Sequence, residues 1–232
     1  MSPVANVAYV TLEAGGQILK FDTTSYAQTG SAAIGLNARH LSISGDGARL
    51  YVSRYVTPPH CPGEGTATVT PTAGTGGEVL QLDATSLGLV RTIVLQHSDK
   101  VDGEAQGRGI PNYLGAAVIS PDGSQAYVPS KQDNVKRGAL RDGTGLNFQN
   151  TVRAISSRID LAANSEDLAS RIDHDNASVA TAACLRAAWR LPVRRPRDRA
   201  ARWRCSMRSR ARSCCASTSA ARRRASRSRP TG

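Results

Sequence analysis

Along the first 180 residues, apolar and polar side chains alternate over short stretches, and turn-forming residues separate these stretches. Alternation with a period of two is the pattern of a β-strand that buries one face. The strands predicted in this way cover residues 6–12, 16–22, 39–44, 48–55, 77–83, 89–95, 115–120, 124–130, 151–161 and about 167–173. The pattern therefore predicts an all-β fold built from short antiparallel strands.

Two short segments recur along the chain. Residues 41–52 (LSISGDGARLYV) match residues 117–128 (AVISPDGSQAYV), and residues 15–25 (GGQILKFDTTS) match residues 76–86 (GGEVLQLDATS). The first pair predicts a hairpin, because an Asp-Gly turn supplies the positive φ that a tight turn requires. The second pair predicts a strand that ends at an aspartate capping a turn. Repeated units of four antiparallel strands are typical of a β-propeller.

The hairpin at residues 120–128 (SPDGSQAYV) and the segment AYVT at residues 8–11 resemble the YVTN-type repeats of bacterial β-propellers, which are related to the quinoprotein-dehydrogenase-like and lactonase-like propellers. The resemblance covers about residues 4–180. It implies an incomplete propeller of about three four-stranded blades, in a chain whose parent protein is periplasmic or extracellular. The expected blade fragments cover about residues 4–35, 37–96 and 112–175. Chemistry does not follow from the resemblance, because one propeller scaffold hosts unrelated functions.

The last fifth of the chain has a different composition. Residues 1–180 carry a net charge of −3, whereas residues 181–232 hold 16 arginines and one acidic residue, which gives them a net charge of +15. An arginine-rich segment can bind nucleic acid. GC-rich DNA translated out of frame gives the same mixture, and the codons of residues 201–232 admit a shifted reading that ends in Ser-Pro-Asp-Gly. We therefore interpret residues 181–232 as an out-of-frame, disordered tail behind a propeller domain at residues 1–180.

Few residues suggest catalysis or metal binding. Cys61 is the only cysteine of the first 180 residues, and His60 with Cys61 falls short of a four-ligand set. Turn chemistry explains the aspartates that precede glycine, and no nucleophile motif stands beside the remaining histidines. These residues are Asp46, Asp122, Asp142, His40, His97 and His174. We therefore expect no catalytic residue, no metal site and no cofactor, and the absence of an apolar run of about 18 residues predicts no membrane span. No signal peptide is predicted either.

Long connections at residues 56–76, 96–113 and 131–150 would all open on one face of a propeller, the long-loop face, and such insertions usually carry binding. The last of them is rich in cations, which suit an anionic group held by forked hydrogen bonds. The alternative is an ordinary solvated loop. The candidate binding residues are Lys131, Lys136, Arg137 and Arg141.

The sequence thus predicts a binding or scaffold module, with a ligand or protein partner on the long-loop face. Two alternatives stay open. The chain is the remnant of a redox or lactonase-like propeller enzyme that lacks its cofactor or electron-transfer module, or it binds nucleic acid through a genuine arginine-rich tail.

Overall fold

The computed structural model describes residues 1–57, 76–104, 106–136, 139–140, 143–145 and 148–174, together with residues 180, 182, 183 and 185. These residues belong to one compact unit, Met1–Ala188. Within them, no helix has the length and apolar character that a membrane span requires.

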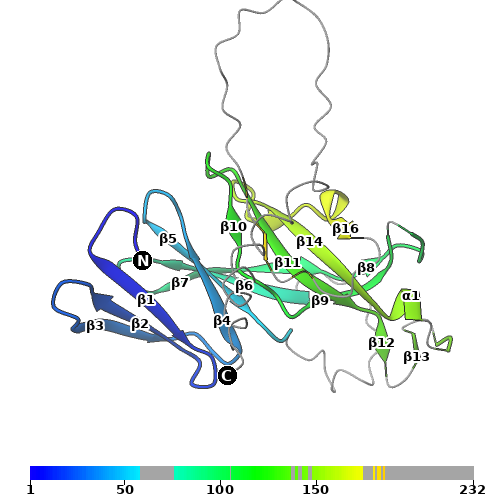
Figure 1. Ribbon diagram of the computed structural model, residues 1–232, viewed down its shortest axis with the longest axis horizontal. Coiled ribbons are helices and arrows are strands. Elements are labelled where there is room, and N and C mark those ends of the chain that lie inside the picture. The colour runs from blue at the N-terminus through cyan, green and yellow to red at the C-terminus, as the bar shows by residue number, and fades with distance from the viewer. Residues whose placement is uncertain are drawn as a thin grey trace, which may run out of the picture. The chain divides into compact units, whose positions relative to one another are not determined.

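Three antiparallel sheets follow one another along the chain (Figure 1). The first sheet contains β1 (Val7–Leu12), β2 (Gln17–Asp22) and β3 (Gln28–Ala33). The second contains β4 (Ala38–Ile43), β5 (Arg49–Arg54), β6 (Gly76–Asp83) and β7 (Leu89–Gln96), and each strand pairs with the next along the chain. The third is centred on β11 (Gln125–Asp133) and β14 (Val152–Asp160). The all-β fold of successive blade-like sheets that the repeats predict is confirmed.

Both flanking positions of the third sheet are shared by two short strands. On one side, β9 (Arg108–Asn112) and β10 (Val118–Ile119) both pair with β11. On the other side, β15 (Ser165–Glu166) and β16 (Ile172–His174) both pair with β14, and the 3₁₀ turn η1 (Leu168–Ser170) separates them. The strands predicted at 115–120 and 167–173 are therefore present but interrupted.

Some elements were not expected from the sequence. The connection at residues 96–113 contains β9 and the short strand β8 (Ser98–Asp99), which pair with each other. The sequence of β3, QTGSAA, has no large apolar residue, so its pairing with β2 rather than its own propensity makes it a strand. The remaining short elements are β12 (Val135–Lys136), β13 (Ala139–Leu140) and α1 (Phe148–Thr151).

The second sheet buries both of its faces, because successive side chains of a strand point to opposite sides. On β5, Leu50 and Val52 face the first sheet, whereas Tyr51 faces the third. The junction of the first and second sheets, here called the first interface, has a core of Ile18, Ile34, Ala38, Leu50, Val52, Leu80, Leu82, Ala84 and Leu87. The junction of the second and third sheets, the second interface, has a core of Tyr51, Val79, Ile93, Leu95, Leu114, Ala117, Ala126, Val128 and Ile159.

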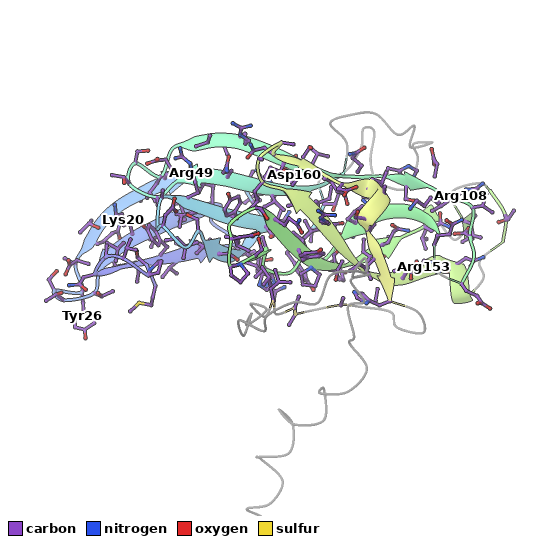
Figure 2. All side chains as sticks on the ribbon, turned by 90° about the horizontal axis from the view of Figure 1, so that it is seen from above. Lys20, Tyr26, Arg49, Arg108, Arg153 and Asp160 are labelled. Atoms are coloured by element: carbon purple, nitrogen blue, oxygen red, sulfur yellow. The ribbon has the colours of Figure 1, made fainter. Side chains whose placement is uncertain are left out.

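The two ends of the strands carry different kinds of connection. The turn end carries the β4–β5, β6–β7, β10–β11 and β14–β15 turns, and the loop end carries the long connections. On β14, for example, Asp160 lies at the turn end and Arg153 at the loop end (Figure 2). A strand of six residues separates the two ends by about 20 Å.

Charged groups of the third sheet also bind it to β7 of the second sheet. Arg171 and Glu166 form an almost fully buried ion pair, with 2.7 Å between Nη2 and Oε1. Arg171 also donates to the Gln96 carbonyl oxygen of β7, and the Gln96 amide donates to the Glu166 carboxylate. Because each buried charge has several partners, its desolvation is offset and the third sheet is tied to the second.

Candidate functional site

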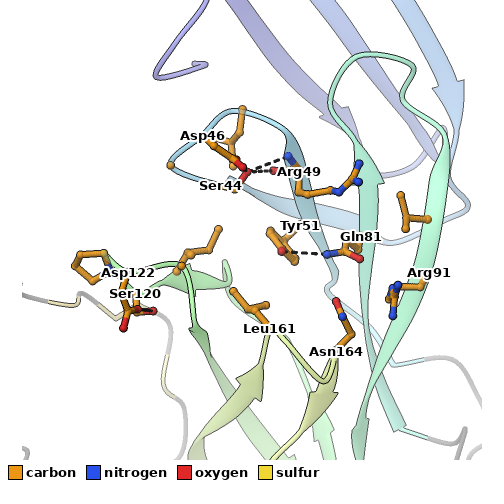
Figure 3. A pocket seen from close by; sticks show the side chains of 16 residues that line it. Ser44, Asp46, Arg49, Tyr51, Gln81, Arg91, Ser120, Asp122, Leu161 and Asn164 are labelled. Atoms are coloured by element: carbon orange, nitrogen blue, oxygen red, sulfur yellow. Dashed lines mark hydrogen bonds between the residues drawn. The ribbon is translucent and has the colours of Figure 1, made fainter.

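A pocket of about 720 Å³ lies at the turn end of the second interface (Figure 3). The second sheet contributes residues of the β4–β5 turn, β5, β6 and β7 to its walls. The third sheet contributes the β10–β11 turn and the β14–β15 turn. This volume is within the range of small-molecule sites, about 300–1,000 Å³.

The pocket wall continues the buried face of the second sheet with polar instead of apolar side chains. Nearer the loop end this face carries Val79 and Ile93, which are almost completely buried. Tyr51, Gln81 and Arg91 lie directly opposite one another across β5, β6 and β7. The period-two pattern thus places a hydroxyl, a carboxamide and a guanidinium side by side at the pocket.

The floor of the pocket offers a hydrogen-bond donor. Gln81 Nε2 donates to the Tyr51 hydroxyl oxygen at 3.1 Å, and the two residues are 6% and 4% exposed. Because this oxygen accepts, the phenolic proton stays available for a ligand. A buried hydroxyl beside an open cavity is a typical polar anchor of a binding site.

Two arginines stand in the same wall. Arg49 Nη1 lies 2.6 Å from Asp83 Oδ2 on the neighbouring strand, so its charge is partly balanced. Arg91 is exposed, and within the described part of the chain it forms no ion pair. The pocket therefore has a free guanidinium at its edge.

Two aspartates of equivalent hairpin turns also border the pocket. Asp46 accepts hydrogen bonds from the Ser44 hydroxyl and the Ala48 amide, and Asp122 accepts from Ser120 and Ser124 in the same manner. The hydrogen bond from the serine hydroxyl is the main reason that the pKa of each aspartate is lowered. The pKa of Asp122 falls to about 2. Both carboxylates are ionised at neutral pH and stabilise their own turns, as the turn chemistry predicts.

The repeats allow the pocket to be compared, position by position, with the first interface. Tyr9 lies opposite Lys20 just as Tyr51 lies opposite Gln81. The turns that follow Asp22, Asp83 and Asp160 are equivalent as well, because each aspartate accepts backbone amide hydrogen bonds. The fourth residue after each has a positive φ: Tyr26 (58°), Leu87 (60°) and Asn164 (53°).

At the first interface the equivalent side chains close the gap. The Tyr9 hydroxyl donates to the Ala84 carbonyl oxygen at 2.9 Å, and Lys20 Nζ donates to the Thr85 carbonyl oxygen at 3.0 Å. Leu87 is 3% exposed and belongs to the core. At the second interface Tyr51 and Gln81 bond each other, and Asn164 replaces the leucine at the pocket wall. The pocket therefore results from a few side chains on a shared backbone plan.

The predicted candidate Lys131 lies at the opposite, loop end. Its Nζ is 3.0 Å from Asp133 Oδ2 and 3.8 Å from the centre of the Tyr113 ring. Tyr113 stacks on Tyr55 with 4.6 Å between the ring centres, and the Arg39 guanidinium lies 4.1 Å from the Tyr55 ring. The structure thus brings Lys131 into an aromatic–cation stack formed by Arg39, Tyr55, Tyr113 and Lys131.

The other predicted candidates do not meet in the described structure. Lys136 belongs to β12, but its side chain is not described. Arg137 and Arg141 lie outside the described residues, as do His60, Cys61 and Asp142. Among the residues that are described, no group of three or more His, Cys, Asp and Glu side chains could hold a metal ion.

One serine–histidine pair was missed by the sequence analysis. Ser156 Oγ lies 2.8 Å from His174 Nε2, across the pairing of β14 with β16. Ser156 is only 3% exposed, so a substrate carbonyl cannot reach its hydroxyl in this arrangement. The pair therefore acts as a cross-strand contact.

No known family model matches the chain, and no curated protein does. Among solved structures, the chain is similar to hydrazine synthase from Kuenenia stuttgartiensis, with a TM-score of 0.36, 15% identity and coverage of 77% of this chain and 49% of that one. It is also similar to dihydro-heme d1 dehydrogenase NirN in complex with DHE, with a TM-score of 0.32, 16% identity and coverage of 72% of this chain and 44% of that one. The chain therefore spans about half the length, or less, of these two chains.

Proposed function

We propose that the chain is a ligand-binding module of a β-propeller repeat protein, and that the pocket of the second interface is its binding site. One observation carries this proposal. The first interface closes at its turn end with Tyr9, Lys20 and Leu87, whereas the second stays open at the equivalent positions. Departures from an otherwise consistent pattern concentrate at functional sites.

The open pocket makes the fold less stable than a closed interface would. A leucine buried at position 164, as at position 87, would contribute about 1.5–3 kcal/mol. The chain instead holds Asn164 there and aligns Tyr51 with Gln81 in the wall. Polar anchors around an otherwise partly apolar cavity are the usual composition of a ligand site.

The substitution Asn164→Leu tests the proposal, because the equivalent position tolerates leucine at a positive φ. We expect ligand-observed NMR with a mixed panel of small aromatic acids, amides and amines to detect binding to the intact chain, and the variant to lose it by at least tenfold. Tyr26→Leu is the matched control, since it puts leucine at the equivalent turn position, which is 83% exposed and remote from the pocket. Equal binding by both variants, or no binding at all, would overturn the proposal.

The long-loop face is a second candidate surface, which we propose for a protein partner. The aromatic–cation stack supports this, because tyrosine and arginine are enriched among residues that dominate interface energies. Loss of a partner's binding on Tyr113→Ala, with unchanged thermal stability, is the expected result. Turnover of a pocket ligand would instead favour the enzyme alternative.

For the repeats themselves we propose membership of the YVTN type, on the evidence of the hairpin at residues 120–128 and the segment at residues 8–11. For residues 181–232 we propose an out-of-frame origin. Translation of the locus in the shifted frames should then give further propeller strands. If it gives none, the arginines become a genuine nucleic-acid arm, whose DNA affinity would fall steeply with salt.

A further inference from the structure

We infer that the pocket selects a small organic oxyanion, a carboxylate or phosphate carried on a compact apolar body. This inference rests on the proposed function and adds the chemical class of the ligand. It comes from the charges and donors on one wall of the pocket and the apolar residues on the other.

The position of Arg91 carries a positive charge only in the second sheet. Arg91 lies opposite Gln81, and the equivalent position of the first sheet, opposite Lys20, is Gly30. The Arg91 guanidinium forms no ion pair with a described carboxylate, so its charge is available to a ligand. Its planar fork of donors matches the two oxygens of a carboxylate or phosphate.

Neutral donors line the same pocket as this guanidinium. The Tyr51 hydroxyl, the Gln81 carboxamide and the Asn164 carboxamide come from three different elements that line the pocket. One N–H of Gln81 donates to Tyr51 and one N–H of Asn164 donates to the Ala162 carbonyl oxygen, so each carboxamide keeps a second N–H for a ligand. Figure 3 shows Gln81 and Asn164 on the side of the pocket where Arg91 lies. An oxyanion at this place would exchange its water shell for charge-assisted hydrogen bonds, which are about twice as strong as neutral ones.

Part of the remaining wall is apolar. Ile43 and Ile119 end equivalent strands of the second and third sheets, and Leu161 begins the β14–β15 turn. These side chains offer no hydrogen bonds, so they favour a hydrocarbon or aromatic body next to the anionic group. The ligand is therefore amphipathic, with its charged group toward β7.

The two turn aspartates set an upper limit on ligand charge. Asp122 lies across the pocket from Arg91 in Figure 3, and Asp46 belongs to the neighbouring turn. Both are ionised at neutral pH, and each has one oxygen engaged by its turn. A ligand with negative charge at both ends would meet these carboxylates, so the pocket favours a single anionic group over a polyanion.

The test uses four probes of similar size: benzoate, phenyl phosphate, benzamide and benzylamine. We expect benzoate or phenyl phosphate to bind the full chain at least tenfold more tightly than benzamide, measured by ligand-observed NMR or calorimetry. The stronger of the two identifies the anionic group as carboxylate or phosphate. Raising the salt concentration should lower the affinity for the two anions and leave the affinity for benzamide unchanged.

Arg91→Gln keeps a polar, hydrogen-bonding side chain but shortens it and removes its charge. It should lower anion affinity about tenfold or more and leave benzamide binding unchanged, because it removes the charge-assisted hydrogen bonds that only the anions form. Lys100→Gln, which removes an exposed cation outside the pocket, is the control and should have no effect. If charged and neutral probes bind equally well and Asn164→Leu abolishes their binding, the oxyanion inference is wrong and the proposed function still holds. Absence of binding by all four probes and by the mixed panel would overturn both.

Discussion

The two faces of the second sheet meet neighbours of the same design, yet the turn ends of the two interfaces differ: side chains bridge the first, whereas the second holds a pocket. At the first interface, two hydrogen bonds and a buried leucine join the β6–β7 turn to β1 and β2. At the second, the equivalent turn leaves room for the pocket. The comparison teaches that the repeated backbone sets where sheets meet, and that a few side chains decide whether the junction is core or site.

The largest expected effect is on the closed side. Leu50 is fully buried at the first interface, so Leu50→Ala should destabilise the chain by about 2–5 kcal/mol through lost burial and a new cavity. Urea unfolding followed by circular dichroism measures this. Arg91→Gln at the open side serves as the reference and should shift the midpoint little. Similar shifts for both variants would mean that the second interface is as tightly packed as the first.

The next prediction tries to open the closed interface. Leu87→Asn puts the pocket's asparagine at the equivalent turn position, where a positive φ suits asparagine. The loss of a buried leucine should cost about 1–3 kcal/mol, partly offset by the relaxed backbone. The measurement is the same urea titration, with Tyr26→Asn as the control for the φ effect alone. A variant as stable as the parent chain would show that Leu87 does not close this interface.

The smallest expected effect concerns the pocket rim and appears only in acid. The Ser120 hydroxyl bond lowers the pKa of Asp122 from its ordinary value of 3.8 to about 2. Its ionised form therefore stabilises the folded chain above about pH 4, and this contribution is lost as the pH falls toward 2. Asp122→Asn should flatten the dependence of the urea midpoint on pH between 4 and 2. Glu104→Gln, which removes an exposed carboxylate outside the pocket, is the control and should leave that dependence as it was.

Much of the fold could be predicted from the pattern along the chain. Alternation and the Asp-Gly hairpins locate all four strands of the second sheet within a residue or two. β3 escaped because its small and polar residues carry no alternation. β9 is a strand through its pairing with β11, which lies in another part of the sequence, and the two-residue strand β8 depends on β9. Propensity is local, whereas pairing is not.

The candidate site was less accessible to sequence reasoning. Lys131 was singled out by its charge, but only the structure shows that it is held by Tyr113 and Asp133. The sequence did not indicate Arg91 as a site residue, because a single arginine in a strand is typical of a solvated surface. The repeat did place Gln81 where the earlier copy has Lys20, and that difference becomes informative only when the neighbouring sheet is known.

The sequence by itself determined the all-β class, the strand order of the second sheet, the turn aspartates and the contrast in charge between residues 1–180 and 181–232. Only the tertiary structure decided which interface is open, since the pocket combines Arg91 of β7 with Asn164 of the β14–β15 turn. These residues are far apart along the chain and belong to different sheets. Short-range periodicity encodes which face of a strand is buried, but the side chains that meet across two sheets are set by packing.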